Sequence, residues 1–345
     1  MTVLWGKPYT RRELMRRIGD IRQVATVEPY EYMEGGERGV RAVRIHNAAG
    51  LELVVVPDRG MSLTQLNYQG IPLPFLSSVG TLNPAFSEPT GTGWLRTWPG
   101  GFLTPCGLTQ VGSPGSDDSE TLGLHGRVAG TPAREVRWGG TWEEDDYLLW
   151  VEGLVTQTAV FGENISLRRR VWTRLGESRF WIEDVIENND FKPVPHMFLQ
   201  HFNLGFPLVD AGSRLVLPAH QTLARDPVAE AGVKHCFECE DPQPGFMEQV
   251  FYHDLRADAS GQVEVRLINQ QFDDGRGLGV YWRYARADYP VLVHWKMMGE
   301  GMYVVGVEPA NCHVEGRSQE RERGTLQVLQ PLESRRYTIE VGFFR

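Results

Sequence analysis

The feature that most constrains the fold of this chain is a long succession of short strand-like segments separated by turn residues. Residues 40–46 (VRAVRIH) alternate apolar side chains with arginine, and residues 51–57 (LELVVVP) form a compact apolar run. The linking stretches LGES, ASGQ, DDGRG and MGEG have the composition of hairpin turns. This pattern predicts an all-β sandwich or barrel rather than a parallel α/β sheet. Further strands are expected at 166–174, 180–187, 263–269, 280–284, 291–296, 303–308 and 337–343.

The helical signal is confined to the start of the chain. Thr10 and Glu13 have the spacing of a capping box, in which each side chain bonds the backbone N–H of the other residue. We therefore expect a short helix within an N-terminal extension over residues 1–25. Its apolar stripe has helical spacing and consists of Leu14, Ile18 and Ile21.

The remainder of the chain shows no internal repeat, no low-complexity tract and no linker, so we expect a single domain over residues 1–345. Residues 77–131 are rich in glycine and proline and are expected to form ordered loops, where function often resides. The charged run EGRSQERERG (315–324) is expected to be an exposed hairpin or loop.

The charge balance limits the partners of this chain. It has 35 basic and 44 acidic side chains, and the net charge of −9 argues against a general affinity for nucleic acid or anionic lipid. No segment approaches the ~20 apolar residues that span a bilayer. The N-terminus carries arginines where a secretory signal would be apolar. We expect a cytoplasmic protein, monomeric or homodimeric, that acts on small molecules.

The four cysteines give little indication of a metal site. Cys236 and Cys239 form one CxxC pair, but no second CxxC or HxxxH pair follows. A structural zinc ion normally needs four ligands. We therefore expect ordinary thiols, and neither a metal nor a cofactor.

His201 interrupts the apolar stretch MFLQHFNLGFPLV. Because side chains alternate faces along a strand, His201 shares a face with Leu199 and Asn203, whereas Gln200 and Phe202 point the other way. Two interpretations are open at this point. The histidine is either a core residue bonded to a neighbouring oxygen or a proton donor directed into a pocket.

A second candidate is the loop TLGLHGRVAG, in which His125 stands between Gly123 and Gly126. Glycines permit positive φ angles and let the backbone approach a ligand closely. His125 and Arg127 could together donate several hydrogen bonds to hydroxyl groups. The alternative is a purely structural turn in which Arg127 is solvated.

A third candidate is Glu308, which lies in the strand-like stretch MYVVGVEPANC. Glu308 shares a face with Gly306, which leaves space beside it, and Pro309 is expected to end the regular strand pairing. A buried glutamate is costly unless it is paired or used. Burial would raise its pKa from about 4.3 towards the range of a useful base. The alternative is an ion pair with one of the arginines.

Three motifs resemble those of the aldose 1-epimerase (galactose mutarotase-like) superfamily. GLHGR (123–127) resembles its Leu-His-Gly-Gly loop, QHFNLGFP (200–207) its His-Pro-Tyr-Phe-Asn strand, and VGVEPANC (305–312) its late strand with the catalytic glutamate. The motifs occur in the order of the family and span most of the chain. PDRGMSL (57–63) and GGFLTPCGLTQVG (100–112) resemble a less-characterised branch.

The resemblance implies a β-supersandwich of two large antiparallel sheets with a sugar cleft on a concave face. It makes His201 the general acid and Glu308 the general base, and it gives His125 a hydrogen bond near the anomeric centre. An arginine in an early loop of the family contacts substrate. By order this is Arg96 in WLRTWPGG, with Arg59 and Arg127 as alternatives.

The chain also departs from the family pattern. Phe202 follows the proposed acid where proline is usual, and Arg127 stands where glycine is usual. The substrate-binding aspartate of the family has no clear counterpart, and Asp226 is only a guess.

Four further residues are candidates for contacting the substrate. Asn203 is expected to bind it from the face of His201, and Trp295 or Phe202 to supply an apolar floor. Lys296, together with Arg127, suggests a negatively charged substrate that carries a carboxylate, sulfonate or phosphate.

The function expected from these residues is mutarotation, the exchange of sugar anomers by a histidine–glutamate pair without a cofactor. Two alternatives are open. The same pair could move a proton on carbon in an epimerase, isomerase or lyase of an oxidised sugar. The protein could also bind sugar without catalysis.

Overall fold

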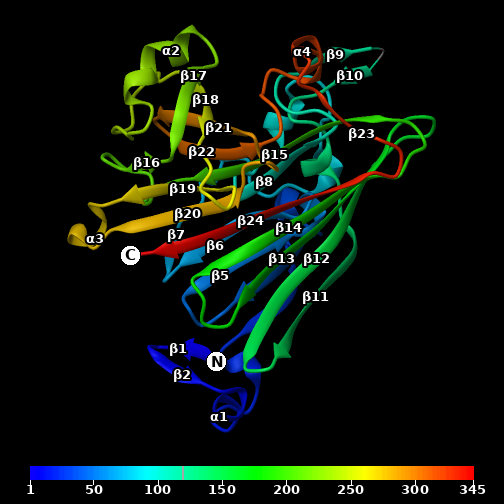
Figure 1. The fold of residues 1–345 in the computed structure, drawn as a ribbon. Coiled ribbons are helices and arrows are strands. Elements are labelled where there is room, and N and C mark those ends of the chain that lie inside the picture. The colour runs from blue at the N-terminus through cyan, green and yellow to red at the C-terminus, as the bar shows by residue number, and fades with distance from the viewer. Residues whose placement is uncertain (119) are drawn as a thin grey trace.

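Two large antiparallel sheets build the protein, as the computed structural model shows for residues 1–118 and 120–345 (Figure 1). Residue 119, within the expected loop segment 77–131, lies outside the described residues. The expected all-β architecture of two large sheets is confirmed. The eight-stranded sheet has the order β11 (Arg134–Glu143), β12 (Asp146–Thr158), β13 (Asn164–Arg174), β14 (Arg179–Asn188), β24 (Ser334–Phe344), β20 (Leu278–Ala285), β19 (Gln262–Asn269) and β16 (Arg214–Val216).

The second sheet has twelve strands and carries the candidate site. Two short strands lie off its main path, where β23 (Gln327–Leu329) pairs with β15 and β7 (Ile71–Pro72) pairs with β6. Its main order is β17 (Ala219–Ala224), β18 (Gln249–Leu255), β21 (Val291–Gly299), β22 (Met302–Ala310), β15 (Val194–Leu204), β8 (Leu103–Leu108), β6 (Ser62–Tyr68), β5 (Leu51–Val56), β4 (Arg41–His46) and β3 (Thr26–Glu31).

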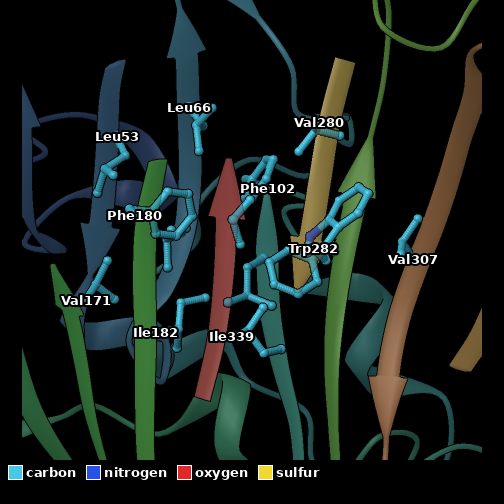
Figure 2. Close-up of a cluster of buried hydrophobic side chains, with 14 of the residues drawn as sticks. Leu53, Leu66, Phe102, Val171, Phe180, Ile182, Val280, Trp282, Val307 and Ile339 are labelled. Carbon is cyan, nitrogen blue, oxygen red and sulfur yellow. The ribbon is translucent and has the colours of Figure 1, made fainter. Parts of the chain in front are cut away.

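The main hydrophobic core fills the space between the two sheets. Figure 2 shows side chains from both sheets in this layer, among them Phe102 and Val307 from one side and Phe180, Ile182 and Trp282 from the other. Along β13 and β14 buried residues alternate with more exposed ones, because one face of the eight-stranded sheet meets this core and the other meets solvent.

The middle of the twelve-stranded sheet is buried on both faces. Nearly every residue of β15 and β22 is buried, which explains their continuous apolar character. Phe198 and Phe202 face the main core, whereas Leu199 belongs to a second apolar cluster with Trp94 and Trp98. Loops therefore cover the outer face of these central strands, and the candidate site lies under that cover.

The N-terminal extension differs from the expected helical segment. It begins with a hairpin of β1 (Thr2–Leu4) and β2 (Lys7–Tyr9), and the helix α1 (Arg11–Met15) is only five residues long. The capping box of Thr10 is present as expected. The helix ends before Ile18 and Ile21, and Asp20 caps a separate 3-10 turn, η1 (Ile21–Gln23), by accepting a hydrogen bond from the Arg22 N–H at 2.8 Å.

The charged run 315–324 was wrongly expected to be an exposed loop. It contains the helix α4 (Arg317–Arg323), in which Arg317 and Glu320 are buried. Arg317 donates to Asp117 at 2.6 Å and to Glu120 at 2.8 Å. These carboxylates belong to the hairpin of β9 (Gly115–Asp117) and β10 (Glu120–Leu122), which lies beside α4 in Figure 1. This charged segment therefore forms a helix with one buried face, and the charged side chain of Arg317 on that face is ion-paired.

The remaining helical elements are short. No helix in the described part of the chain is long and apolar enough to cross a membrane. The helices are α2 (Pro227–Gly232) and α3 (Phe272–Gly275), with 3-10 turns η2 (Gly35–Glu37), η3 (Pro57–Arg59), η4 (Pro84–Phe86), η5 (Gly93–Arg96), η6 (Val128–Gly130) and η7 (Val233–His235).

Candidate active site

His201 and Glu308 meet on neighbouring strands of the twelve-stranded sheet. The flanking pairs Leu199–Ala310 and Phe202–Val307 between β15 and β22 put the two residues at opposed positions of the antiparallel ladder. His201 Nε2 lies 3.5 Å from Glu308 Oε1. The two side chains therefore form a close pair that the chain separates by more than a hundred residues.

Gly306 makes room for the carboxylate of Glu308. A Cβ atom at position 306 would lie 2.4 Å from Glu308 Oε1 and 2.9 Å from the Cβ of Trp295. The absence of a side chain at this position is thus a requirement of the pair. The expectation that Gly306 leaves space beside Glu308 is confirmed.

Regular pairing does not stop at Pro309, contrary to expectation. The ladder between β21 and β22 continues through Leu292–Pro309 to Val291–Ala310. Glu308 is itself paired with Val293, so its backbone is held on a regular strand.

Burial shifts the pKa values of the pair in opposite directions. His201 is 5% exposed and Glu308 is 2% exposed. Burial raises the pKa of Glu308 well above 4.5, and Glu248 adds to this rise, whereas Arg225 opposes it. Burial lowers the pKa of His201 well below 6.5, with a further contribution from His125. Both shifts favour the uncharged pair, in which the carboxyl group holds the proton and the imidazole is free to accept one.

The hydrogen-bonding capacity of this pair is not used up within the protein. His201 Nδ1 and Glu308 Oε1 are buried and have no hydrogen-bond partner among the described residues. Buried polar groups are normally satisfied, because an unmet donor or acceptor costs roughly 1–3 kcal/mol. Such unpaired atoms beside a cavity are available to a ligand.

Aromatic rings surround His201. The ring centroids of Trp94, Trp98 and Trp295 lie 6.2, 5.7 and 5.7 Å from that of His201. His125 completes the wall at 5.5 Å. This surrounding provides apolar surface against which the face of a sugar ring could pack.

His125 is held in place by the backbone of its loop. Its φ angle is +56°, and its backbone N–H donates to the Gly112 carbonyl at 3.0 Å. Its Nδ1 accepts a weak hydrogen bond from the Gly112 N–H at 3.4 Å. Burial lowers its pKa to about 4, so the ring is neutral near pH 7. The adjacent Gly126 is needed because a Cβ there would lie 2.5 Å from the Gly107 carbonyl oxygen.

A cavity of about 670 Å³ joins these groups and is also lined by Arg225 and Glu248. Arg225 donates to Glu248 at 3.0 Å, and the Trp295 indole N–H donates to the other carboxylate oxygen at 2.9 Å. Glu248 is therefore oriented by two donors. Arg225 is also bound to Asp226 at 2.8 Å, so its single positive charge is shared by two carboxylates.

Two of the predicted arginines lie outside this cavity. Arg127 pairs with Glu163 at 3.0 Å and with Glu120 at 3.7 Å. The side chain of Arg96 is 77% exposed and lies 3.7 Å from Glu88. Neither residue lines the cavity.

Three further candidates are buried but do not line the cavity either. Arg59 donates to the Thr97 carbonyl at 2.6 Å. The Asn203 side chain donates to the carbonyls of Gly101 and His201. Lys296 is directed to the opposite side of the sheet from Trp295, where it pairs with Glu240 at 2.7 Å.

The basis for an acidic substrate is therefore absent from the cavity, since neither Lys296 nor Arg127 reaches it. Phe202 packs against Phe102 and Trp282 in the main core, as strand alternation requires, and is no floor for a sugar. Asp226 caps α2 through the Ala229 N–H at 3.0 Å.

The residues that sequence reasoning missed are Trp94, Trp98, Arg225 and Glu248. The two tryptophans flank the favoured Arg96 in WLRTWPGG, and large aromatic residues in a glycine-rich loop are a usable signal. Arg225 and Glu248 carry no local motif. They meet only because β17 and β18 are neighbouring strands.

The cysteines of the CxxC pair do not line this cavity. Cys236 and Cys239 are buried free thiols, and residues 1–118 and 120–345 contain no group of three or more potential ligand side chains.

The two-sheet fold places the protein in the galactose mutarotase-like superfamily, in a less-characterised branch. A structure of a candidate aldose 1-epimerase from Klebsiella pneumoniae subsp. pneumoniae MGH 78578 superposes with a TM-score of 0.87 at 25% identity. The match covers 92% of this chain and 83% of that one. The chain belongs to the family described as Domain of unknown function (DUF4432), whose model matches residues 37–343.

More distant structures share the fold alone. A galactose mutarotase-like protein from Clostridium acetobutylicum gives a TM-score of 0.62 at 13% identity, covering 94% of this chain and 99% of that one. The galactose 1-epimerase of Lactobacillus acidophilus NCFM gives 0.58 at 14% identity, covering 93% and 99%. A comparison with curated proteins found no match.

Proposed function

We propose that this protein is an aldose 1-epimerase that exchanges the anomers of a sugar by acid–base catalysis with His201 and Glu308. The observation that carries this proposal is their opposed placement, 3.5 Å apart, at the base of an aromatic-walled cavity. Their displaced pKa values and unpaired atoms support it, because such features concentrate at functional sites.

Mutarotation needs one proton delivered to the ring oxygen and one removed from the anomeric hydroxyl. In the uncharged pair, Glu308 would deliver the first proton and His201 would accept the second. This starting arrangement reverses the roles expected from sequence, in which the histidine begins as the acid. After ring opening and rotation of the aldehyde, the roles exchange as the ring closes, so both protonation states occur in each cycle.

Other cavity residues would bind and orient the sugar. His125 presents a neutral imidazole beside His201, and Glu248 presents a carboxylate that could accept hydrogen bonds from sugar hydroxyls. The three tryptophans would bind the apolar face of the ring.

The charge of the cavity supports a neutral sugar as the substrate. Among the described residues that line it, the one cationic side chain is Arg225, which is bound by Glu248 and Asp226. An acidic sugar would have to compete with these carboxylates and would lie near Glu308 and Glu248.

The proposal is tested by anomer exchange, measured by NMR magnetisation transfer on a panel of neutral and acidic aldoses. The wild-type protein should accelerate exchange of at least one neutral aldose. The variants His201→Gln and Glu308→Gln should each lose about 10²–10⁴-fold of that acceleration. His253→Gln is a matched control, because His253 is a buried histidine outside the cavity, bonded to Thr222 at 2.9 Å.

Two outcomes would contradict the proposal. No acceleration for any sugar by the folded protein would leave binding without catalysis. Deuterium uptake from heavy water into a C–H bond would indicate chemistry on carbon, because anomer exchange leaves carbon-bound hydrogens in place.

A further inference from the structure

Arg59 is a buried arginine that has no acidic partner among the described residues. Its residue is 2% exposed, and no carboxylate within the described part of the chain forms an ion pair with it. The two other buried arginines, Arg169 and Arg317, bind the carboxylates of Asp184 and Asp117 at 2.7 and 2.6 Å. Buried charges are normally paired, because removing a charge from water costs several kcal/mol.

Most of the hydrogen-bond donors of Arg59 are unused. Nη2 donates to the Thr97 carbonyl at 2.6 Å, and Nη1 donates to Ser87 Oγ at 3.3 Å. Nε has no partner in the described part of the chain. A guanidinium has five N–H donors, so two bonds to neutral acceptors satisfy less than half of them. Burial lowers the pKa of Arg59 to about 10, which leaves the group charged near pH 7.

A second cavity of about 210 Å³, here called the Arg59 pocket, is lined by this guanidinium. Ser87, Thr131 and Arg127 also line it. Trp94 belongs to both this pocket and the larger cavity, so the indole lies between them.

The polar groups of the pocket suit an anion. Because Ser87 Oγ accepts from Arg59, its own hydroxyl hydrogen is free to donate to a ligand. Gly130 is required beside it, since a Cβ there would lie 2.6 Å from Ser87 Oγ. Arg127 also lines the pocket, but its charge is offset by Glu163 at 3.0 Å and Glu120 at 3.7 Å, so Arg59 is the main source of positive charge. Glu88 also lines the pocket, as a half-exposed carboxylate that lies 3.7 Å from Arg96.

We propose that the Arg59 pocket binds a small free oxyanion, such as inorganic phosphate or sulfate, at a site separate from the His201–Glu308 cavity. Arg59 supplies the charge and the fixed N–H donors, and Ser87 supplies a hydroxyl donor. This site is independent of the proposed epimerase activity, because Trp94 separates it from His201 and Glu308.

The experiment measures binding of inorganic phosphate to the full chain by titration calorimetry and thermal shift, at constant ionic strength set with chloride. Wild-type protein should bind phosphate saturably, and its Tm should rise with phosphate and not with chloride. Arg59→Met should lose about 10–100-fold in phosphate affinity, the loss expected for hydrogen bonds to a charged group. Glu308→Gln should bind phosphate as the wild type does.

Two substitutions near the pocket give controls of opposite kind. Arg96→Gln removes a nearby exposed charge that does not line the pocket and should change affinity less than threefold. Glu88→Gln removes the negative charge inside it and should strengthen binding. If Arg59→Met does not fold, Ser87→Ala decides the matter, with an expected loss of roughly fivefold for one hydrogen bond.

The opposite results would overturn the proposal. These are the absence of saturable phosphate binding by the wild type, or equal phosphate binding by Arg59→Met or Ser87→Ala. Binding of glucose 6-phosphate alone, with no binding of inorganic phosphate, would assign the anion to a sugar substrate and would also overturn a free-oxyanion site.

Discussion

Two buried polar clusters lie on opposite faces of β15, and they differ in how completely they are satisfied. On the face towards the main core, Arg169 binds Asp184 through two hydrogen bonds of 2.8 and 2.7 Å. Gln200 accepts from Arg169 at 2.7 Å and donates to Asp184 at 2.6 Å. The carboxylate and the amide are both bound, and only Arg169 Nη1 lacks a partner among the described residues.

On the other face, the His201–Glu308 pair is similarly buried but loosely bound. Its closest atoms are 3.5 Å apart, and an atom of each side chain is unpaired within the described residues. It adjoins a cavity, whereas the Arg169 cluster is enclosed by the two sheets. Burial of polar groups therefore does not by itself indicate function. Unmet hydrogen-bonding capacity beside a cavity is the informative feature.

The largest expected effect comes from removing both members of the loose pair. His201→Gln and Glu308→Gln should each reduce kcat/KM for anomer exchange by about 10²–10⁴-fold, and the double variant should lose little more than either single one. The reason is that one residue cannot complete the proton exchange without the other. Steady-state rates on the best aldose would check this. A double loss equal to the product of the single losses would show that the residues act independently.

Breaking the tight pair should affect stability instead of chemistry. Asp184→Asn leaves Arg169 buried without its carboxylate and should cost about 3–5 kcal/mol of unfolding free energy. Activity per folded molecule should remain near the wild-type value. Urea unfolding is the measurement, with Glu183→Gln on the solvent-facing side of β14 as the control. A loss below 1 kcal/mol would contradict the structural role of this cluster.

A smaller effect is expected at Glu248, which lines the same cavity. Glu248→Gln should raise KM roughly tenfold, because a hydrogen bond to a charged group contributes about 1.5–3 kcal/mol. The change in kcat should be smaller, since Glu248 does not take part in the proton transfers. Kinetics of this variant, compared with the exposed control Glu230→Gln, would check the assignment. A fall in kcat at constant KM would place Glu248 in the chemistry.

The smallest effects concern the pH dependence of stability. The raised pKa of Glu308 means that the unfolded chain ionises above about pH 4.5 while the folded carboxyl stays protonated, so the wild type loses stability as pH rises. The lowered pKa of His201 makes the wild type lose stability as pH falls below about 6.5. Each effect is about 1.4 kcal/mol per unit of displaced pKa.

Substitution should remove these two dependences separately. Relative to the wild type, Glu308→Gln should be more stable at pH 8 than at pH 5, and His201→Gln should show the opposite trend. Thermal unfolding across pH 4–9 would measure both. Parallel curves for all three proteins would mean that neither pKa is displaced.

Much of the fold could be predicted from sequence because strand patterning is local. The segment 291–296 is a short run of mostly apolar residues, which is typical of a strand, and it is part of β21. The capping box at Thr10 was equally readable. The helix α4 was not, because its buried face is formed by ion pairs with a hairpin about two hundred residues earlier.

The candidate site likewise contains residues that could be predicted from sequence and residues that could not. Gly306 and Glu308 lie on one face of one strand, so strand alternation was enough to relate them. Strand alternation was not enough to place the three arginines expected to contact the substrate. None of the three lines the cavity, because each side chain is held by other partners, Arg127 by Glu163, Arg96 by Glu88 and Arg59 by Thr97.

The sequence by itself therefore determined the all-β class of this protein, the neighbours that share a face with His201 and with Glu308, and the space beside Glu308. These properties follow from alternation and side-chain volume over a few residues. Only the tertiary structure decided that the two residues are opposed across β15 and β22, and that three tryptophans enclose them. It also decided that Arg59 is buried with no carboxylate partner in the described part of the chain. These features depend on the order of the strands in the sheets and on which side chains the fold shields from water. A local sequence pattern encodes neither.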